Sequence, residues 1–316
     1  MRLKTILTSV TALLVTLCVS GQKLTRNVGT VPDAYNFWLY APEGGEDAAK
    51  AAEDGADAGE PQKKPVFIFL HGASLCGNNL DRVRRYGTID AIEKGRKIDG
   101  YVIAPQNPGG SWNPRKVMNI LDWVEDNYDV DKDRVYVLGM SLGGYGTIDV
   151  AASYPERIAA AMAVCGGGTV GNLAGLNELP LWIIHGTGDR AVSVKESDKV
   201  VSAMKKAMGG DTPRLAYDRI PGMNHSQPAR IFYMPESYDW LLSHSLSDES
   251  RSIAQTFDVT FNSLRKAYEG LTRGKSGVSA SRSKARASKS RARAAKAKSR
   301  ATRQKASARK KRASKK

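Results

Sequence analysis

The sequence contains little cysteine and little histidine. Its 316 residues include 3 cysteines and 4 histidines. No two cysteines stand in a Cys-x-x-Cys spacing, and the histidines are scattered along the chain at positions 71, 185, 225 and 244. These absences exclude the common thiol redox motif and the clustered ligands of a structural zinc site. We therefore expect neither a metal ion nor a cofactor.

A long apolar run is also missing from the N-terminal segment. Residues 1–22 read MRLKTILTSVTALLVTLCVSGQ, with two early basic residues, a mostly apolar stretch over 6–19 and small residues before Gln22. A membrane-spanning helix needs about 20 apolar residues, so the stretch is short for one. The pattern is typical of a secretory signal peptide, which we predict over residues 1–21 and exclude from the fold. A membrane anchor or a core helix is the alternative.

Export would place the mature chain in a periplasm, on a cell surface or in the medium. Such compartments permit a disulfide between Cys76 and Cys165. The sequence does not show that the two residues meet, and two buried free thiols are the simpler interpretation.

Acidic residues are absent from residues 273–316, which contain 19 Lys and Arg. The rest of the chain carries 29 basic and 32 acidic residues, a net charge of −3 against +16 for the whole. Because this tail has nothing large and apolar to bury, we predict that it is disordered when unbound. A flexible polycation binds anionic polymers by releasing counterions. We expect the tail to tether the protein to anionic polymers or surfaces; nucleic acid is a less favoured partner, and a merely solvated extension is the alternative.

Apolar runs alternate with helical patterns between these two ends. Strands are predicted over 34–40, 65–70, 101–105, 135–139, 158–166, 180–186 and 214–220, and helices over 116–128, 144–154, 194–208 and 236–246. Strands that are apolar on both faces and alternate with helices predict an α/β fold over residues 22–248, with a mainly parallel sheet covered by helices on both faces. Residues 41–64 are acidic and low in complexity, and we expect a solvated loop there.

The segment 249–272 has a helical pattern of its own. Five apolar residues share one helical face: Phe257, Phe261, Leu264, Tyr268 and Leu271. We predict an amphipathic helix that docks on the domain, because exposing these rings to water is costly. Packing against a partner is the alternative.

The motif Gly-Met-Ser-Leu-Gly at residues 139–143 lies between a predicted strand and a predicted helix. In this Gly-x-Ser-x-Gly context the glycines permit a tight, strained turn that lifts the Ser141 hydroxyl above the end of the sheet. An ordinary glycine turn is the alternative. A serine nucleophile needs a base, and the base needs an orienting acid. In chain order these are Asp189, on the loop after strand 180–186, and His225, on the loop after strand 214–220.

Acyl transfer also needs N–H donors for an oxyanion. One is expected from Leu142, directly after the nucleophile, and the other from Ala73 in the loop HGASLCG, with Ser74 as the next choice. His71 is expected to brace this loop. Trp112 is a candidate for stacking on a sugar or aromatic acyl group, and a packing role is the alternative.

The segments LHGASLCG, APQNPGGSW, VYVLGMSLGGYG, LPLWIIHGTGD and NHS, in this order, resemble the α/β-hydrolase superfamily. The resemblance covers residues 34–246 and is narrower to exported esterases: feruloyl and acetyl-xylan esterases, polyhydroxybutyrate-depolymerase-like enzymes and predicted peptidases. It implies a catalytic triad of Ser141, Asp189 and His225, the residues that the motif and chain order also indicate.

A short connection between two strands bears on the substrate. Only residues 166–179 separate the end of one predicted strand, near Cys165, from the next strand at Pro180, which leaves no room for a large cap domain. We expect an open site and an exported serine hydrolase that cleaves carboxylic esters, with acyl groups on a polysaccharide or similar bulky substrate favoured. The alternatives are a serine peptidase that acts on small peptides, and a polyanion- or nucleic-acid-binding protein with an inactive hydrolase domain.

Overall fold

The computed structural model describes residues 15–19, 22–42, 63–253 and 257–272. The chain divides into a unit Met1–Leu271, which holds every described element, and a unit Thr272–Lys316, of which Thr272 alone is described. Residues 273–316 of the basic tail, residues 43–62 of the acidic loop and residues 1–14 lie outside the described residues.

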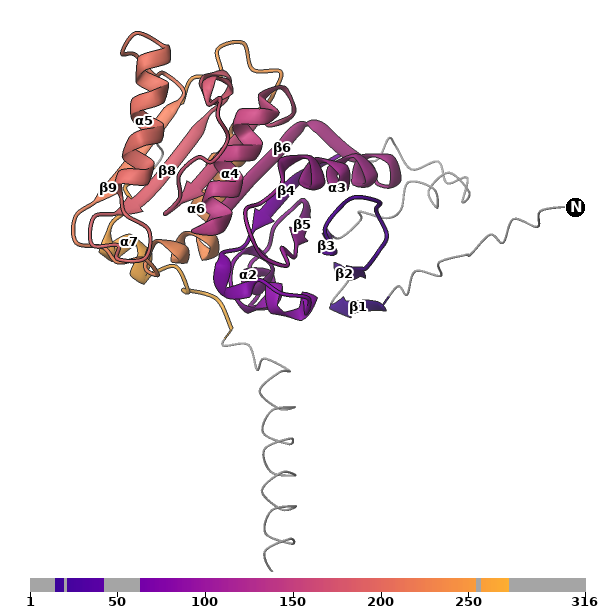
Figure 1. Cartoon of the computed structure of the whole chain (residues 1–316). Coiled ribbons are helices and arrows are strands. Elements are labelled where there is room, and N and C mark those ends of the chain that lie inside the picture. Colours follow the sequence, from indigo (N-terminus) through magenta and orange to yellow (C-terminus); the bar gives the residue numbers. More distant parts are fainter. Residues whose placement is uncertain (1–14, 20–21, 43–62, 254–256, 273–316) are drawn as a thin grey trace, which may run out of the picture. The chain divides into compact units, whose positions relative to one another are not determined.

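The described elements form one nine-stranded sheet with the order β1-β2-β3-β5-β4-β6-β7-β8-β9 (Figure 1). The first three strands and β5 pair antiparallel, and all pairings from β5 to β9 are parallel. The strands are β1 (Val15–Val19), β2 (Gln22–Asn27), β3 (Phe37–Ala41), β4 (Lys64–Leu70), β5 (Tyr101–Pro105), β6 (Val130–Met140), β7 (Ala160–Val164), β8 (Leu181–Gly186) and β9 (Leu215–Ile220).

Side chains alternate across this sheet and feed two separate cores. Along β4, Phe67 and Phe69 enter one core, whereas Val66, Ile68 and Leu70 enter the other. Since both faces of the inner parallel strands β4, β5, β7 and β8 are buried, these strands are largely apolar, which is the pattern that the sequence shows. The predicted α/β fold with a mainly parallel sheet is therefore confirmed.

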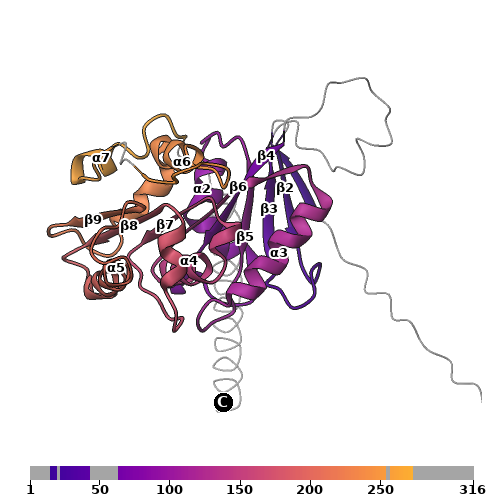
Figure 2. The same ribbon diagram turned by 90° about the horizontal axis from the view of Figure 1, so that it is seen from above.

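Helices cover both faces of the sheet (Figure 2). One face carries α3 (Pro114–Asn127), α4 (Leu142–Ser153) and α5 (Lys195–Ala207). The other carries α2 (Thr88–Glu93), α6 (Pro235–Leu242) and α7 (Phe261–Arg265). Short 3-10 turns are η1 (Ala73–Leu75), η2 (Leu80–Arg85), η3 (Pro155–Arg157), η4 (Ala174–Glu178) and η5 (Pro228–Tyr233).

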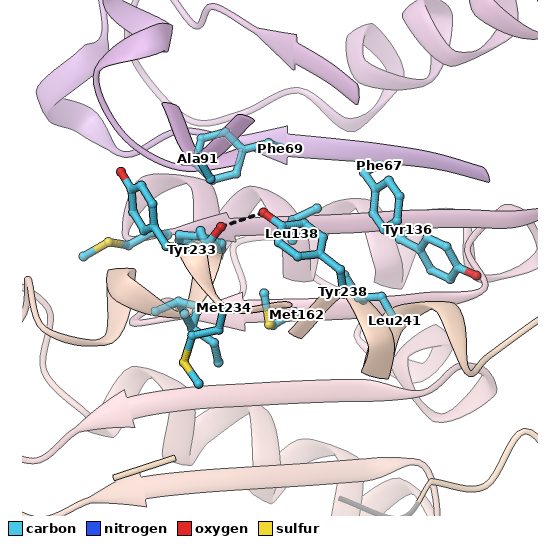
Figure 3. Packing of buried hydrophobic residues seen from close by; sticks show 14 of the residues in the cluster. Phe67, Phe69, Ala91, Tyr136, Leu138, Met162, Tyr233, Met234, Tyr238 and Leu241 are labelled. Carbon is cyan, nitrogen blue, oxygen red and sulfur yellow. Dashed lines mark hydrogen bonds between the residues drawn. The ribbon is translucent and has the colours of Figure 1, made fainter. Parts of the chain in front are cut away.

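The core beneath α6 is built from aromatic contacts (Figure 3). Phe67 packs on Tyr136 with ring centroids 5.2 Å apart and on Tyr238 of α6 at 5.7 Å in an edge-to-face arrangement. The Tyr238 hydroxyl donates to the carbonyl oxygen of Phe232 at 2.7 Å. The Tyr136 hydroxyl donates to the carbonyl oxygen of His244 at 2.8 Å, so both tyrosines fill the core without leaving a hydroxyl unsatisfied.

The connection from β7 to β8 contains only the short turn η4. The absence of a large cap domain at this point of the chain is therefore confirmed. No helix among the described residues is both long and apolar enough to cross a membrane.

The N-terminal segment differs from the prediction. Residues Val15–Val19, which the sequence analysis excluded from the fold, form the edge strand β1 and pair antiparallel with β2. The β-branched residues Val15, Thr16 and Val19 suit a strand as well as they suit an apolar leader. The full chain thus pairs a stretch that the sequence analysis set apart from the fold, while the signal-peptide assignment stays a prediction. Because β1 lies at the edge of the sheet, its removal would expose only the ladder of β2.

The long amphipathic helix over 249–272 was also a wrong prediction. Helix α7 spans only Phe261–Arg265, and residues 254–256 lie outside the described residues. Its start is fixed by Thr260, whose side chain accepts from the N–H of Ser263 in a capping box. Docking on the domain is nevertheless observed, because Leu264 is buried and Phe257 packs against Trp182 at 5.1 Å.

Candidate active site

A sharp turn after β6 presents Ser141. Its backbone has φ 58° and ψ −121°, a conformation that residues with side chains rarely adopt. The turn needs both flanking glycines: a Cβ on Gly139 would lie 2.4 Å from the carbonyl oxygen of Gly143, and a Cβ on Gly143 would lie 1.8 Å from that of Leu70. The predicted strained turn between strand and helix is therefore present.

The loops after β8 and β9 bring Asp189 and His225 to this turn. Nε2 of His225 lies 3.0 Å from Oγ of Ser141, and Nδ1 of His225 lies 2.6 Å from Oδ2 of Asp189. The Asp189 side chain is fully covered, while the His225 side chain is 27% exposed. The three residues selected from chain order thus form one hydrogen-bonded chain that reaches solvent at the histidine.

The loops that carry Asp189 and His225 are tied to each other. The N–H of Gly188 donates to the carbonyl oxygen of Met223 at 3.0 Å, and the N–H of Gly222 donates to Oγ1 of Thr187 at 2.8 Å. Gly186 permits this contact, since a Cβ there would lie 2.1 Å from the Met223 carbonyl oxygen. The distance from Asp189 to His225 is therefore fixed by backbone contacts.

The carboxylate of Asp189 is held by several donors. Oδ1 accepts from the N–H groups of Ala191 at 2.8 Å and Val192 at 2.9 Å. Burial raises the pKa of this carboxyl, but hydrogen bonds from His225, Val192 and Ala191 lower it by more, so the net shift is downward. Asp189 is therefore ionised at neutral pH and suited to face the Nδ1–H of His225.

The two expected oxyanion donors both stand at the start of a helical turn. Leu142 is the first residue of α4 and Ala73 is the first residue of η1, positions whose N–H groups have no partner within the helix. Gly72 brings the second turn close, since a Cβ on Gly72 would lie 3.3 Å from Cβ of Ser141. The N–H of Gly72 itself is engaged by the hydroxyl of Tyr86 at 2.6 Å, a contact that the sequence did not reveal.

His71 braces this loop, as expected. It is fully buried, its Nε2 accepts from the N–H of Asn107 at 3.0 Å, and its Nδ1 therefore carries the proton that reaches the carbonyl oxygen of Gly72 at 2.8 Å. Burial lowers the pKa of His71 to about 4, although the hydrogen bond to Gly72 raises it. The His71 imidazole is therefore neutral at neutral pH.

His185 is a further contact of the site, to which the sequence analysis gave no role. It is fully buried near the end of β8, and its Nε2 lies 3.2 Å from Oδ2 of Asp189. In the sequence, only its position four residues before Asp189, in HGTGD, indicated that His185 could contact the site.

Comparisons with known proteins find similarity to esterases over part of the chain. The family model described as "Putative esterase" matches residues 111–229. Poly(3-hydroxyalkanoate) depolymerase C of Paucimonas lemoignei is 25% identical over 160 residues, which cover 45% of this chain and 33% of that protein. The bifunctional acetylxylan esterase/xylanase XynS20E of Neocallimastix patriciarum is 28% identical over 141 residues, which cover 42% of this chain and 20% of that protein. The chain thus matches a third or less of the length of these two relatives.

A solved structure described as a thermostable esterase has the same fold. It superposes with a TM-score of 0.51 at 23% identity, covering 74% of this chain and 63% of that one. The chain is similar to esterases over part of its length and has an α/β-hydrolase fold. In this α/β-hydrolase fold, Ser141 occupies the turn after the central strand β6, and the matched residues 111–229 include Ser141, Asp189 and His225.

Trp112 does not fit a stacking role. Its side chain is 3% exposed, its Nε1 donates to the carbonyl oxygen of His71 at 3.3 Å, and its ring packs edge-on against the His71 ring at 5.0 Å. The substrate-stacking prediction was therefore wrong, and the packing alternative describes the residue. Ser74 is exposed, and its carbonyl oxygen accepts from Arg82 at 2.5 Å.

An open hollow adjoins His225. It is lined by Gly188, Arg190, Ala191, Asn224, His225 and Ser226. Beyond the histidine, Arg190 contributes the charged side chain of this lining. Polar groups of the hollow can therefore meet the part of a substrate that extends past the imidazole.

One cluster has the residue types of a metal site. Ligand atoms of Cys165, His185 and Asp189 lie within 4.8 Å of one another. Burial raises the pKa of the Cys165 thiol, so it stays protonated, and Asp189 and His185 are already hydrogen bonded. These residues fit a hydrogen-bond network better than a metal ion. Both Cys76 and Cys165 are free thiols, so no disulfide joins them.

Proposed function

We propose that this chain is a serine carboxylesterase that acts through Ser141, His225 and Asp189. The observation that carries the proposal is the hydrogen-bonded chain from Asp189 through His225 to Ser141, with distances of 2.6 and 3.0 Å. Serine, a base and an orienting acid in this arrangement are the requirement for acyl transfer. The esterase family match over residues 111–229 supports a carboxylesterase-type hydrolase.

The protons of His225 set the direction of the first step. Ionised Asp189 accepts Nδ1–H, so Nε2 is left to accept the proton of Ser141 Oγ. As Oγ bonds to the ester carbonyl carbon, His225 takes this proton, and Asp189 stabilises the imidazolium that forms. The oxyanion of the tetrahedral intermediate would accept from the N–H groups of Leu142 and Ala73.

The second half of the cycle reverses these roles. His225 returns its proton to the alcohol oxygen as the carbon–oxygen ester bond breaks, which leaves the acyl group on Ser141. Water then attacks the acyl carbon while His225 takes one of its protons. Release of the carboxylic acid restores the Ser141 hydroxyl with the proton from His225.

The substrate that we propose is an acyl group displayed on a polysaccharide or similar bulky carrier. The short connection between β7 and β8 and the open hollow beside His225 support access for a large substrate. Similarity to an acetylxylan esterase and to a polyester depolymerase points to the same class. A peptidase with the same triad is the alternative within hydrolases.

The ends of the chain support two further proposals. Residues 1–21 are proposed to direct export, and residues 273–316 to hold the enzyme on anionic polymers or surfaces through 19 Lys and Arg. Full-length protein should bind an anionic matrix at low salt and elute as salt rises. A form that ends at residue 272 should pass through. Equal retention of both forms would contradict the tethering role.

The activity is tested by hydrolysis of p-nitrophenyl acetate with the full chain and with Ser141→Ala. We expect activity in the first and a rate close to the uncatalysed one in the second. A panel of acetylated and feruloylated xylans and small peptides then separates esterase from peptidase. No hydrolysis of any ester or peptide would favour a polyanion-binding protein with an inactive domain.

A further inference from the structure

His185 shares one oxygen of Asp189 with His225. Its Nε2 lies 3.2 Å from Oδ2 of Asp189 and 3.0 Å from the carbonyl oxygen of Val192. Nδ1 of His225 reaches the same Oδ2 at 2.6 Å. Two imidazoles therefore converge on a single carboxylate oxygen, one partly exposed and one fully buried.

The surroundings of His185 determine where its proton lies. Both groups that face Nε2, a backbone carbonyl and an ionised carboxylate, accept hydrogen bonds and donate none. Nε2 must therefore carry a proton, since a bare nitrogen between two acceptors would be buried without a donor. On the other side, Nδ1 lies 2.8 Å from the hydroxyl of Ser197, which can donate or accept.

Ser197 adjusts to either state of the ring. Its hydroxyl donates to the carbonyl oxygen of Gly166 at 2.7 Å, in which case Nδ1–H donates to Oγ and the ring is doubly protonated. If the hydroxyl turns toward Nδ1 instead, His185 is neutral with its proton on Nε2. Both arrangements leave Nε2–H facing the carbonyl oxygen of Val192 and Oδ2 of Asp189.

Charged and titratable groups surround His185 from several elements. Asp189 and His225 face it from the two catalytic loops, Cys165 lies at the end of β7, and Asp198 of α5 is paired with Arg219 of β9. Burial lowers the pKa of His185. The Val192 carbonyl and Asp189 raise it by less, so the net shift is downward. The neutral ring with Nε2–H is the favoured state at neutral pH.

We propose that His185 is a positioning residue for Asp189. It donates Nε2–H to Oδ2, so that the carboxylate is held in the orientation that receives the proton of His225. The backbone donors from Ala191 and Val192 hold Oδ1, and His185 restrains rotation about the remaining side-chain bond. The inference rests on the proposed triad of Ser141, Asp189 and His225, and it assigns no contact of His185 with substrate.

Two substitutions separate this role from simple packing. The amide nitrogen of Gln reaches the place of Nε2, so His185→Gln keeps a donor for Asp189. The amide of Asn reaches only the place of Nδ1, so His185→Asn keeps the Ser197 side and loses the Asp189 side. Both variants bury a polar amide at the same position, which makes them matched in their effect on the core.

The activity readout is kcat and KM for p-nitrophenyl acetate. We expect His185→Asn to lower kcat about tenfold, equal to about 1.4 kcal/mol of barrier, with KM changed little. We expect His185→Gln to recover most of the loss. Equal kcat in the parent and in a folded Asn variant, or equal losses in both variants, would overturn the inference.

A proton spectrum gives a readout that needs neither activity nor a variant. Nitrogen-15 correlation of the histidine rings in the full chain should show His185 with a proton on Nε2. A bare Nε2 would overturn the inference even if the Asn variant does not fold. If the parent hydrolyses no ester, the proposed function fails, while this spectrum still decides the state of His185.

Discussion

A Cβ atom on Gly143 would lie 1.8 Å from the carbonyl oxygen of Leu70, closer than any real contact. The turn that presents Ser141 therefore exists only because strand β4 and helix α4 approach each other at a residue without a side chain. We predict that Gly143→Ala destabilises the folded state by about 3 kcal/mol or more, because backbone on both sides must shift. Chemical denaturation with urea measures this change.

Gly171 provides the matched control. A Cβ there would meet nothing within 4 Å, so Gly171→Ala should change the free energy of unfolding by no more than about 0.5 kcal/mol. Similar losses in both variants would mean that the contact between Gly143 and Leu70 is not the cause.

Tyr86 supports the loop that carries Ala73. Its hydroxyl accepts from the N–H of Gly72, and burial raises the pKa of Tyr86 to about 12, so the hydroxyl stays neutral. Tyr86→Phe leaves that N–H without its partner, which should cost about 1–3 kcal/mol of stability. We also expect kcat for p-nitrophenyl acetate to fall more than KM changes, since the adjacent oxyanion donor loses its support. Unchanged kcat in the folded variant would argue against Ala73 as a donor.

The buried neutral His71 predicts sensitivity to acid. Its pKa is lowered from 6.5 to about 4 by burial, so between these values the unfolded chain binds a proton that the folded protein does not. The stability that this group contributes is complete above pH 6.5 and is lost as pH falls toward 4. At pH 5 the loss is about 2 kcal/mol.

Comparison with His71→Asn isolates this contribution. The variant should be less stable than the parent at pH 7, because the N–H of Asn107 loses its acceptor. Its further loss between pH 7 and pH 5 should be smaller than that of the parent by about 2 kcal/mol. Urea denaturation at both pH values measures the difference, and parallel losses would show that His71 is not the titrating group.

The sequence analysis selected Ser141, Asp189 and His225 because each follows a predicted strand, and parallel strands end at the same edge of a sheet. The role of Trp112 was mispredicted because the sequence around a tryptophan does not show whether its ring is buried against His71 or exposed to a substrate. The length of helix α7 was overestimated because periodic apolar spacing does not reveal that the helix begins only after the cap at Thr260.

Contacts between distant segments could not be predicted from one sequence. The partner of the Gly72 N–H is Tyr86, from the turn after η2. The partners of His185 are nearer in the chain: Asp189 and Val192 share one loop, and Ser197 lies on α5. Strand β1 was missed because its residues also fit a leader peptide. Its pairing with β2, which in turn pairs with β3, is not visible in the sequence.

The central claim is that Ser141 is a nucleophile activated by His225 and Asp189. The most direct test is mass spectrometry of the full chain after treatment with a fluorophosphonate, which labels activated serines. We predict one adduct, located on Ser141, absent from Ser141→Ala and formed at least about a hundredfold more slowly in His225→Ala. Absence of labelling in the folded parent, or an adduct on a different residue, would contradict the account.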